Sequence, residues 1–336
     1  MQSIQLQKYG EPLRFVDTQR PTPMPNEVLV RVEYSGLNHG DERLRAGEFK
    51  AVAHFDLPMI IGSEFSGKIV ETGSQVTDWR IGEKVYAHVQ LERSGAWAEY
   101  VPIPATLISK IPETIDLKLA AGLPVNALTA WQALTTIGRV QTDDVVLIQG
   151  GAGSVGLLAV ELALHLGAKV VTTASAKDRQ RLEELGVSRV IDYRTEDFVE
   201  VAKQEDIHPT FVLDTQGEKT LLGAMQIVAP GATVVGISGP PDIDFARSLG
   251  AKKPVQWIIK TLSYRVRRAA KKAGAHYTFF FVSPNGQDLS EITKLVDAGI
   301  LYPHQGTEVK FSEIPQALAD LTGGALRGKI LAKHSL

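Results

Sequence analysis

The chain has no cysteine among its 336 residues. That absence excludes a disulfide framework, a cysteine nucleophile, an iron–sulfur cluster and every zinc site built from thiolates. The sequence also lacks a run of about 20 apolar residues, the length that a membrane-spanning helix requires. Its first stretch, MQSIQLQKYGEPLRF, lacks the basic-then-apolar layout of a secretory signal. We therefore expect a cytoplasmic protein without integral membrane association.

Net charge is also nearly absent, at −2. Nothing global therefore draws the chain toward nucleic acid or an anionic surface. An apolar content of 44% and a charged content of 22% are ordinary for a globular protein, and the length fits about two domains. One local exception is the stretch 260–272, which holds six Lys or Arg residues. It is interpreted as a solvated helix face, or alternatively as a patch for an anion or a lipid headgroup.

The pattern of hydrophobic residues divides the chain into two regions. The segments 27–37 and 65–76 are β-branched, partly alternating and bounded by Pro and Gly, which favours short strands in a barrel or sandwich. From about residue 118 onward, apolar strands alternate with helical segments. Such alternation predicts a parallel sheet covered on both faces, a doubly wound α/β domain.

A glycine-rich turn stands between the first strand and helix of that second region. The strand covers residues 145–148, the helix covers 154–166, and Gly151-x-Gly153-x-x-Gly156 joins them. In a dinucleotide site these glycines permit a tight turn, an approach to pyrophosphate and close helix packing. The helix N-terminus adds N–H groups for the phosphates. The predicted phosphate-binding residues are Gly151, Ala152, Gly153, Ser154, Val155 and Gly156; the alternative is a turn without ligand.

The end of the second strand of this region bears on the choice of cofactor. NAD sites usually hold Asp or Glu there, to bind the ribose 2′-hydroxyl. Here the place falls near Ala174, followed by Ser175, Lys177 and Arg179. A hydroxyl and two cations without a carboxylate suit a 2′-phosphate, so NADPH is predicted over NADH. Alternatively, Lys177 and Arg179 only begin a solvated helix.

Several further segments occur in an order that resembles one known family. They include GLNHGDERLRAG, LPMIIGSEFSGKIVETGSQV, GAWAEYV, AAGLPVNALTAWQAL, GGAGSVGLLAVELALHLGAKVVTTAS and LGVSRVIDYRTEDF. Together they resemble the zinc-free quinone oxidoreductase branch of the medium-chain dehydrogenase/reductase superfamily, over nearly the whole length.

The resemblance implies a Rossmann domain inserted into a GroES-like β-barrel domain, with the cofactor in the cleft between them. The expected boundaries are 1–120 for the first part of the catalytic domain, 121–275 for the NADPH-binding domain and 276–336 for the return. It also implies a homodimer. Tyr193, Gly217 and Ile237 are expected to border the cofactor, and Phe281 to wall the cleft. The alternative for Tyr193 is a partly buried aromatic at a strand end, and for Phe281 it is an ordinary buried strand.

The same resemblance implies that the catalytic zinc of related enzymes is absent. Asn38, Ser63 and Val125 fall where those relatives carry metal ligands, and only Glu64 survives. One carboxylate does not make a zinc site. The histidines His39, His54 and His88 lack ligand spacing and are interpreted as surface or hydrogen-bonded residues.

Hydride transfer to an electron-poor acceptor is the chemistry that remains, because such an acceptor needs no Lewis acid. Asn38 is the expected donor to a nicotinamide or substrate oxygen, with a loop-forming role as the alternative. Arg43 is also a predicted catalytic residue. It stands where many relatives have Tyr, which removes a candidate proton donor, supplies a cation instead and leaves the substrate class open. Thr129 is expected to border the nicotinamide, or else to cap a first helical turn. Asp41 is interpreted as a structural ion-pair or turn residue.

The sequence thus predicts an NADPH-dependent reductase of quinones or α,β-unsaturated carbonyls, acting on a small electron-poor acceptor and on no nucleic acid. Two alternatives stay open. One is a reductase of enoyl thioesters, with the 260–272 stretch receiving a phosphate-bearing carrier. The other is an NADPH-binding protein with little turnover.

Overall fold

The computed structural model describes residues 1–50, 53, 55–326 and 328–334. By its contacts the chain divides into two compact units. One contains Met1–Leu128 with Ser283–Leu336, and the other contains Thr129–Val282. We call them the barrel unit and the sheet unit. The predicted domain boundaries after residues 120 and 275 lie eight and seven residues before the observed boundaries.

The barrel unit is built around the long strand β3 (Glu27–Leu37). Its main sheet has the order β15-β16-β3-β5-β6-β8, and β7 also pairs with β3. The other strands of this sheet are β5 (Glu64–Thr72), β6 (Lys84–His88), β7 (Tyr100–Pro104), β8 (Ile108–Lys110), β15 (Thr307–Lys310) and β16 (Ile330–Lys333). Because β16 pairs antiparallel with the end of β3, residues 330–333 lie against residues 34–37.

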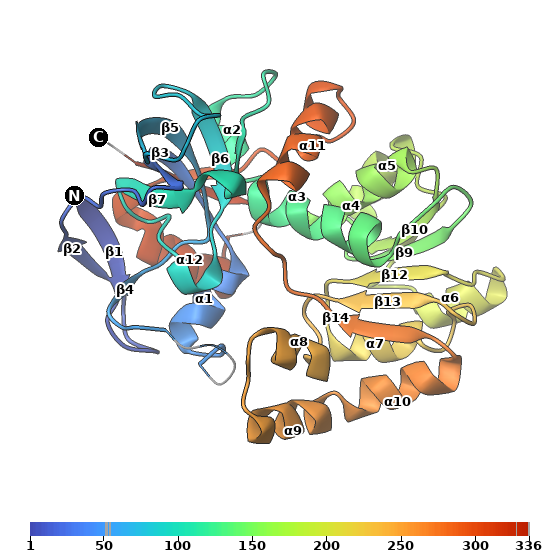
Figure 1. The fold of residues 1–336 in the computed structure, drawn as a ribbon. Helices are drawn as coiled ribbons and strands as arrows, with labels where there is room; N and C mark the ends of the chain where they lie inside the picture. The colour runs from blue at the N-terminus through green and yellow to red at the C-terminus, as the bar shows by residue number, and fades with distance from the viewer. Residues whose placement is uncertain (51–52, 54, 327, 335–336) are drawn as a thin grey trace. The chain divides into compact units, whose positions relative to one another are not determined.

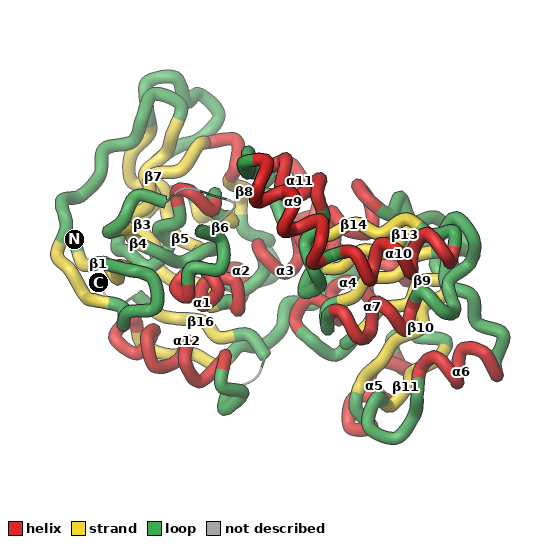
Figure 2. Tube along the Cα trace, turned by 90° about the horizontal axis from the view of Figure 1, so that it is seen from below, coloured by secondary structure: helices red, strands yellow, loops and turns green. Residues whose placement is uncertain are grey.

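Smaller elements complete the barrel unit, seen in the tube view of Figure 2. A three-stranded sheet joins β1 (Gln2–Leu6), β2 (Arg14–Asp17) and β4 (Met59–Ile60). The helices are α1 (His39–Ala46), α2 (Leu117–Ala121), α11 (Gly286–Asp297) and α12 (Ile314–Thr322). Helix α3 (Pro124–Trp131) contains the boundary between the units and continues into a π-helical turn, η3 (Gln132–Ile137).

The sheet unit contains six strands in parallel, in the order β11-β10-β9-β12-β13-β14 (Figure 1). They are β9 (Val145–Gln149), β10 (Lys169–Ala174), β11 (Arg189–Asp192), β12 (Phe211–Asp214), β13 (Thr233–Gly236) and β14 (His276–Phe279). The order reverses between β9 and β12, and ligands of open α/β sheets bind outside the strand ends at such a point. The predicted doubly wound sheet is confirmed.

Strand β14 corrects one expectation, because residues 276–279 were assigned to the returning catalytic domain. Its backbone pairs in parallel with β13, from Thr233↔His276 to Gly236↔Phe279. The segment YTFFFV fits a strand of either sheet, because the sequence of a short apolar strand does not indicate which strand it pairs with. The return to the barrel unit therefore begins after Val282.

Helices connect and cover the strands of the sheet unit. They are α4 (Ser154–His165), α5 (Ala176–Glu184), α6 (Phe198–Gln204), α7 (Glu218–Ala224), α8 (Ile243–Ser248), α9 (Lys253–Leu262) and α10 (Tyr264–Ala273). One core joins Leu147, Val171 and Val212 of the strands to residues of α6, α7 and α10. Near-continuous apolar strands such as β9 match burial on both faces.

Candidate functional site

The glycine-rich turn follows β9 and opens α4, as the sequence predicts. Gly150 has a φ of 77°, in the left-handed region that favours glycine. Its N–H donates to Thr173 Oγ1 at 2.9 Å, and the Gly151 N–H donates to the Thr173 carbonyl at 3.0 Å. These bonds fix the turn against β10, so that the first N–H groups of α4 stand at the carboxyl edge of the sheet.

Close contacts explain why two positions of the motif are glycine. A Cβ at Gly156 would lie 2.1 Å from the Gly150 carbonyl oxygen, and one at Gly151 would lie 2.0 Å from Thr172 Oγ1. At Gly153 the nearest atom would be the Gly150 carbonyl oxygen, at 3.3 Å. Gly151 and Gly156 are thus required by packing, whereas packing leaves Gly153 nearly free. The space kept open at Gly153 fits the approach of a pyrophosphate.

Two buried polar atoms lie at the ends of the strands that flank the reversal point. Gln149 ends β9, and its Nε2 has no partner among the described residues. Asp214 ends β12; its Oδ1 accepts from the N–H groups of Gln216 and Gly217, whereas Oδ2 has no described partner. Burial raises the pKa of Asp214. Since buried polar groups are normally paired, these atoms and the glycine turn fit a bound dinucleotide.

The end of β10 carries the residues that were predicted to bind a 2′-phosphate. Ala174 is buried, and the Ser175 hydroxyl donates to Asp178 Oδ2 at 2.6 Å. Lys177 is exposed on the first turn of α5. Arg179 instead donates to Glu196 Oε2 at 3.0 Å, which commits this guanidinium to an ion pair. Of the two predicted cations, Lys177 is therefore exposed to solvent, whereas Arg179 is held in an ion pair with Glu196.

Tyr193 and Arg194 stand beside this strand end, on the loop that follows β11. Tyr193 is 59% exposed, and its N–H donates to the Ala174 carbonyl at 3.2 Å. Tyr193 thus stands at the end of a strand, as its alternative interpretation expects, with more than half of its surface exposed. Arg194 lies with its guanidinium 5.8 Å from the Tyr193 ring centroid, and the sequence reasoning missed it. The only sign of Arg194 in the sequence is its position next to Tyr193 in DYRTEDF.

The remaining predicted cofactor residues also follow strands at the carboxyl edge. Gly217 precedes α7 with a φ of 117°, and the Ile237 N–H after β13 donates to the Asp214 carbonyl at 3.0 Å. Phe281 comes two residues after β14, with its ring 6.0 Å from that of Phe245. Because all six strands are parallel, these positions share one edge with the glycine turn.

In the barrel unit, Asn38 precedes α1 and is fully engaged by its own neighbours. Its Nδ2 donates to Ser63 Oγ at 2.9 Å and to Glu64 Oε1 at 2.8 Å. Its Oδ1 accepts from Lys329 Nζ at 2.7 Å. Both amide hydrogens are already used in this arrangement, and donation by this amide to a nicotinamide or substrate oxygen stays a prediction.

Lys329 is a second residue that the sequence reasoning missed. It lies just before β16, with its side chain 3% exposed, and its ammonium also bonds to Glu64 Oε1. Glu64 is fully buried, and its other oxygen accepts from the Val125 N–H at 2.8 Å. A buried carboxylate requires such compensation. Strand β3 leaves space for the Glu64 carboxylate at Gly36, where a Cβ would lie 2.3 Å from Glu64 Oε1.

This donor set does not fit a zinc ion. An amide, a hydroxyl and a peptide N–H stand at three of the predicted ligand places, and the Lys329 ammonium binds the one carboxylate. Zinc prefers thiolate, imidazole and carboxylate ligands, and an ammonium would repel it. Within the described ranges, no group of three or more His, Cys, Asp or Glu residues is arranged to hold a metal.

Two of the three histidines named from the sequence can be placed. His88 is buried, with Nδ1 2.7 Å from the Ser63 carbonyl oxygen. His39 begins α1, and burial together with the Lys329 charge lowers its pKa. His54 lies outside the described residues.

Arg43 and Thr129 are the other two predicted catalytic residues, and their catalytic roles stay predictions. Arg43 Nε donates to Glu48 Oε2 at 2.7 Å, and the guanidinium lies 5.2 Å from the Phe49 ring centroid. Thr129 is 5% exposed in the body of α3, which begins at Pro124. The alternative of a first-turn capping hydroxyl is therefore wrong.

Asp41 is a second buried carboxyl near Asn38 and Glu64, and the shift of its pKa leads to a prediction for stability. It accepts from the Asn38 N–H at 2.8 Å, and burial raises its pKa to about 7. The folded state therefore retains a proton that the unfolded chain releases above its ordinary pKa. This contribution to stability is full at acid pH and is lost as the pH rises toward about 7.

We expect Asp41→Asn to remove that pH dependence, since an amide keeps the neutral acceptor. Relative to the variant, the wild-type free energy of unfolding should fall by about 2–3 kcal/mol between pH 5 and 8. Urea unfolding at both pH values measures the difference. The exposed Asp78, changed to Asn, controls for the loss of one charge. Parallel pH curves for wild type and Asp41→Asn would contradict the assignment.

Comparisons with known proteins agree with this architecture. A family model described as the alcohol dehydrogenase GroES-like domain matches residues 24–113, and one described as zinc-binding dehydrogenase matches residues 185–331. The chain is 30% identical over 323 residues to a mitochondrial NAD(P)H oxidoreductase of Danio rerio, covering 91% of this chain and 83% of the relative. It is 28% identical to a human homolog of the synaptic vesicle membrane protein VAT-1, covering 93% and 80%.

A solved structure also matches along the whole chain. The quinone oxidoreductase from Coxiella burnetii is 30% identical, with a TM-score of 0.82 and 99% of each chain covered. No helix among the described residues is long and apolar enough to cross a membrane.

Proposed function

Because the chain belongs to the medium-chain dehydrogenase/reductase superfamily, in its zinc-independent quinone oxidoreductase branch, we propose that it is an NADPH-dependent reductase of quinones or α,β-unsaturated carbonyls. The Glu64–Lys329 pair carries this proposal, since an ammonium occupies the surroundings in which zinc-dependent relatives hold their metal. An alcohol would need a Lewis acid to become an alkoxide, whereas an electron-poor acceptor does not.

The cofactor is held by the carboxyl edge of the sheet unit. Gly151 to Gly156 would bind the pyrophosphate through the turn and the N-terminus of α4. When bound, the reduced nicotinamide supplies a hydride. The protein's own part is to orient cofactor and acceptor and to keep the residues before α1 fixed through Asn38, Glu64 and Lys329. The proton for the reduced acceptor comes from water or an exchangeable side chain.

NADPH is proposed over NADH because no carboxylate ends β10, while Lys177 and Arg194 stand beside it. Lys177 is exposed, and Arg194 lies against the Tyr193 ring. A hydrogen bond to a charged group contributes about 1.5–3 kcal/mol, so each cation lost should weaken NADPH binding by about tenfold or more. We expect Lys177→Ala/Arg194→Ala to lose affinity for NADPH and to keep its affinity for NADH.

Titration of nucleotide binding by fluorescence or calorimetry measures both dissociation constants. Arg179→Ala is the matched control, because Arg179 is paired with Glu196 and should contribute less. Equal or tighter binding of NADH by the wild-type protein would contradict the proposed preference.

The proposal includes a homodimer in the cytoplasm. Strand β14 is the edge of the parallel sheet, and no described strand pairs with its outer side. The Phe279 N–H on that side donates to Asp242 Oδ2 at 2.8 Å, and a second copy of the strand would pair with the edge groups that remain. Sedimentation velocity of the intact protein tests the oligomeric state, and fractionation of the source cells tests the compartment.

A further inference from the structure

Helices α9 and α10 present an apolar and basic surface that the proposed reaction does not use. Four of the large apolar side chains that are most exposed on the protein gather within eight residues: Trp257 (71% exposed), Ile258 (60%), Leu262 (59%) and Tyr264 (55%). In Figures 1 and 2 the two helices follow one another along the outside of the sheet unit. We call these four residues, with the exposed cations around them, the α9–α10 surface.

The apolar side chains of α9 form a stripe on its outer face. Pro254, Ile258 and Leu262 are spaced as i, i+4 and i+8, and Trp257 follows Pro254 by three positions, so all four lie on one side of the helix. The opposite side packs inward: Ile259 is 5% exposed, and Val266 and Ala270 of α10 belong to the core. An amphipathic helix normally buries its one apolar stripe, but α9 has a second that remains exposed.

The charged residues of α9 and α10 have a single sign, and the nearby acids Asp244 and Glu218 pair with Arg247 and Arg265. Between residues 245 and 287 the sequence contains no Asp or Glu. The cations in that interval are Arg247, Lys252, Lys253, Lys260, Arg265, Arg267, Arg268, Lys271 and Lys272. Arg267 is used internally, donating to Ser263 Oγ and to the Lys260 carbonyl. Lys260 lies over Trp257, with its Nζ 5.6 Å from the ring centroid.

We propose that the α9–α10 surface docks onto an anionic lipid bilayer. A helix with an exposed aromatic and aliphatic stripe, flanked by Lys and Arg, lies in the interface between headgroups and acyl chains. Tryptophan favours this boundary, and each cation near the headgroups adds about 1 kcal/mol of attraction. A second copy is a poorer partner, because a two-fold contact would set these cations against each other.

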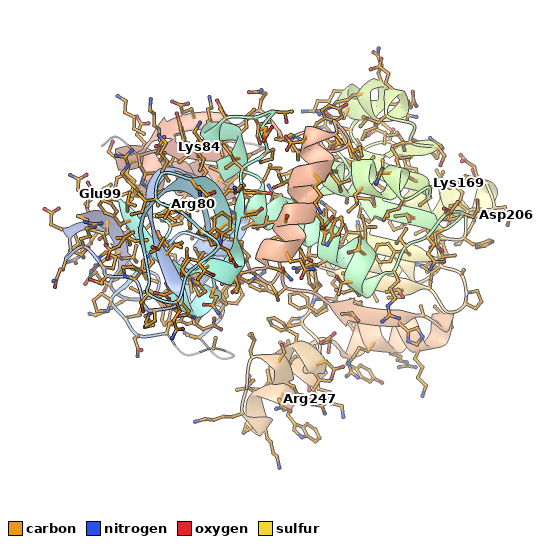
Figure 3. The ribbon with its side chains drawn as sticks, turned by 45° about the horizontal axis from the view of Figure 1, so that its top comes forward. Arg80, Lys84, Glu99, Lys169, Asp206 and Arg247 are labelled. Atoms are coloured by element: carbon orange, nitrogen blue, oxygen red, sulfur yellow. The ribbon has the colours of Figure 1, made fainter. Side chains whose placement is uncertain are left out.

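Co-sedimentation with vesicles tests the proposal, using the full chain without cofactor or acceptor. We expect binding to equimolar phosphatidylcholine and phosphatidylglycerol, little binding to pure phosphatidylcholine, and release at about 1 M salt. The variant Arg268→Gln/Lys271→Gln/Lys272→Gln should reduce the partition coefficient by about 100-fold. The control Arg80→Gln/Lys84→Gln/Lys169→Gln makes the same charge change at residues outside α9 and α10, labelled in Figure 3, and should bind normally.

A second readout places the apolar stripe in the bilayer. Trp257 is strongly exposed, whereas Trp97 is fully buried. Brominated lipids should therefore quench the wild-type protein, and Trp257→Phe should lose most of that quenching while it still sediments with vesicles. Trp257→Ser/Ile258→Ser/Leu262→Ser should fail to bind and keep its secondary structure.

Four results would overturn the proposal. They are absence of binding to anionic vesicles, an equal loss in the control triple variant, preferential binding to poly-glutamate, and a change of oligomeric mass in the serine variant without loss of vesicle binding. The last two would assign the surface to an acidic polypeptide or to a second copy. None of these measurements depends on catalysis, so they separate this proposal from that of the reductase.

Discussion

Replacing Lys329 with Met should be among the most destabilising single changes in the barrel unit. Glu64 is fully buried, and the ammonium of Lys329 is its cationic partner. Removing that ammonium leaves a buried carboxylate without a cationic partner and takes a donor from Asn38 Oδ1. Breaking a buried pair in this way costs about 3–5 kcal/mol. Urea unfolding of Lys329→Met measures the loss.

A double variant separates loss of charge pairing from loss of packing. In Glu64→Gln/Lys329→Met neither charge remains, so it should be more stable than Lys329→Met alone. Lys68→Met is the matched control: Lys68 pairs with Glu33 at 2.9 Å, with both side chains partly exposed. A pair of that kind contributes at most about 1 kcal/mol. Equal stability of Lys329→Met and Lys68→Met would contradict the assigned role.

The second large effect is expected at the glycine-rich turn. In Gly156→Ala the new Cβ would stand 2.1 Å from the Gly150 carbonyl oxygen, which is backbone and cannot turn aside. Either the turn or α4 must move, so we expect both the melting temperature and NADPH affinity to fall, the affinity by about 100-fold or more. That factor corresponds to about 3 kcal/mol.

Gly153→Ala should behave differently, and the contrast makes the prediction specific. Its Cβ would meet only the Gly150 carbonyl oxygen, at 3.3 Å, so the fold should hold. NADPH binding should still weaken strongly, because the methyl group would occupy the space proposed for the pyrophosphate. Gly95→Ala, with its nearest atom at 3.8 Å, should change neither quantity. Normal NADPH affinity in Gly153→Ala would place the cofactor elsewhere.

The sequence predicted those parts of the fold that local patterns encode. Residues 27–37 were predicted as a strand and form β3 with the same bounds. The glycine turn was predicted from three glycines between an apolar strand and a helix, and β9 and α4 flank it. Both predictions depend on neighbouring residues, whose spacing already fixes which side of an element is buried.

Long-range pairing could not be predicted in the same way. Lys329 meets Glu64 across 265 positions of sequence, and GKIL indicated only a strand. Arg179 was expected beside a phosphate, but it forms an ion pair with Glu196 of the loop after β11. The partner of a charged side chain is decided by which strands become neighbours, and no local period records that choice.

The most direct test of the central claim is NADPH oxidation by protein dialysed against a strong chelator. Simple quinones, an alkenal and an enoyl thioester serve as acceptors, with added zinc as a parallel condition. We predict turnover with quinones or the alkenal, unchanged by chelator or zinc, because Lys329 stands beside Glu64 where a metal would need a ligand. Tight NADPH binding without oxidation by any acceptor, or turnover that requires zinc, would contradict the account.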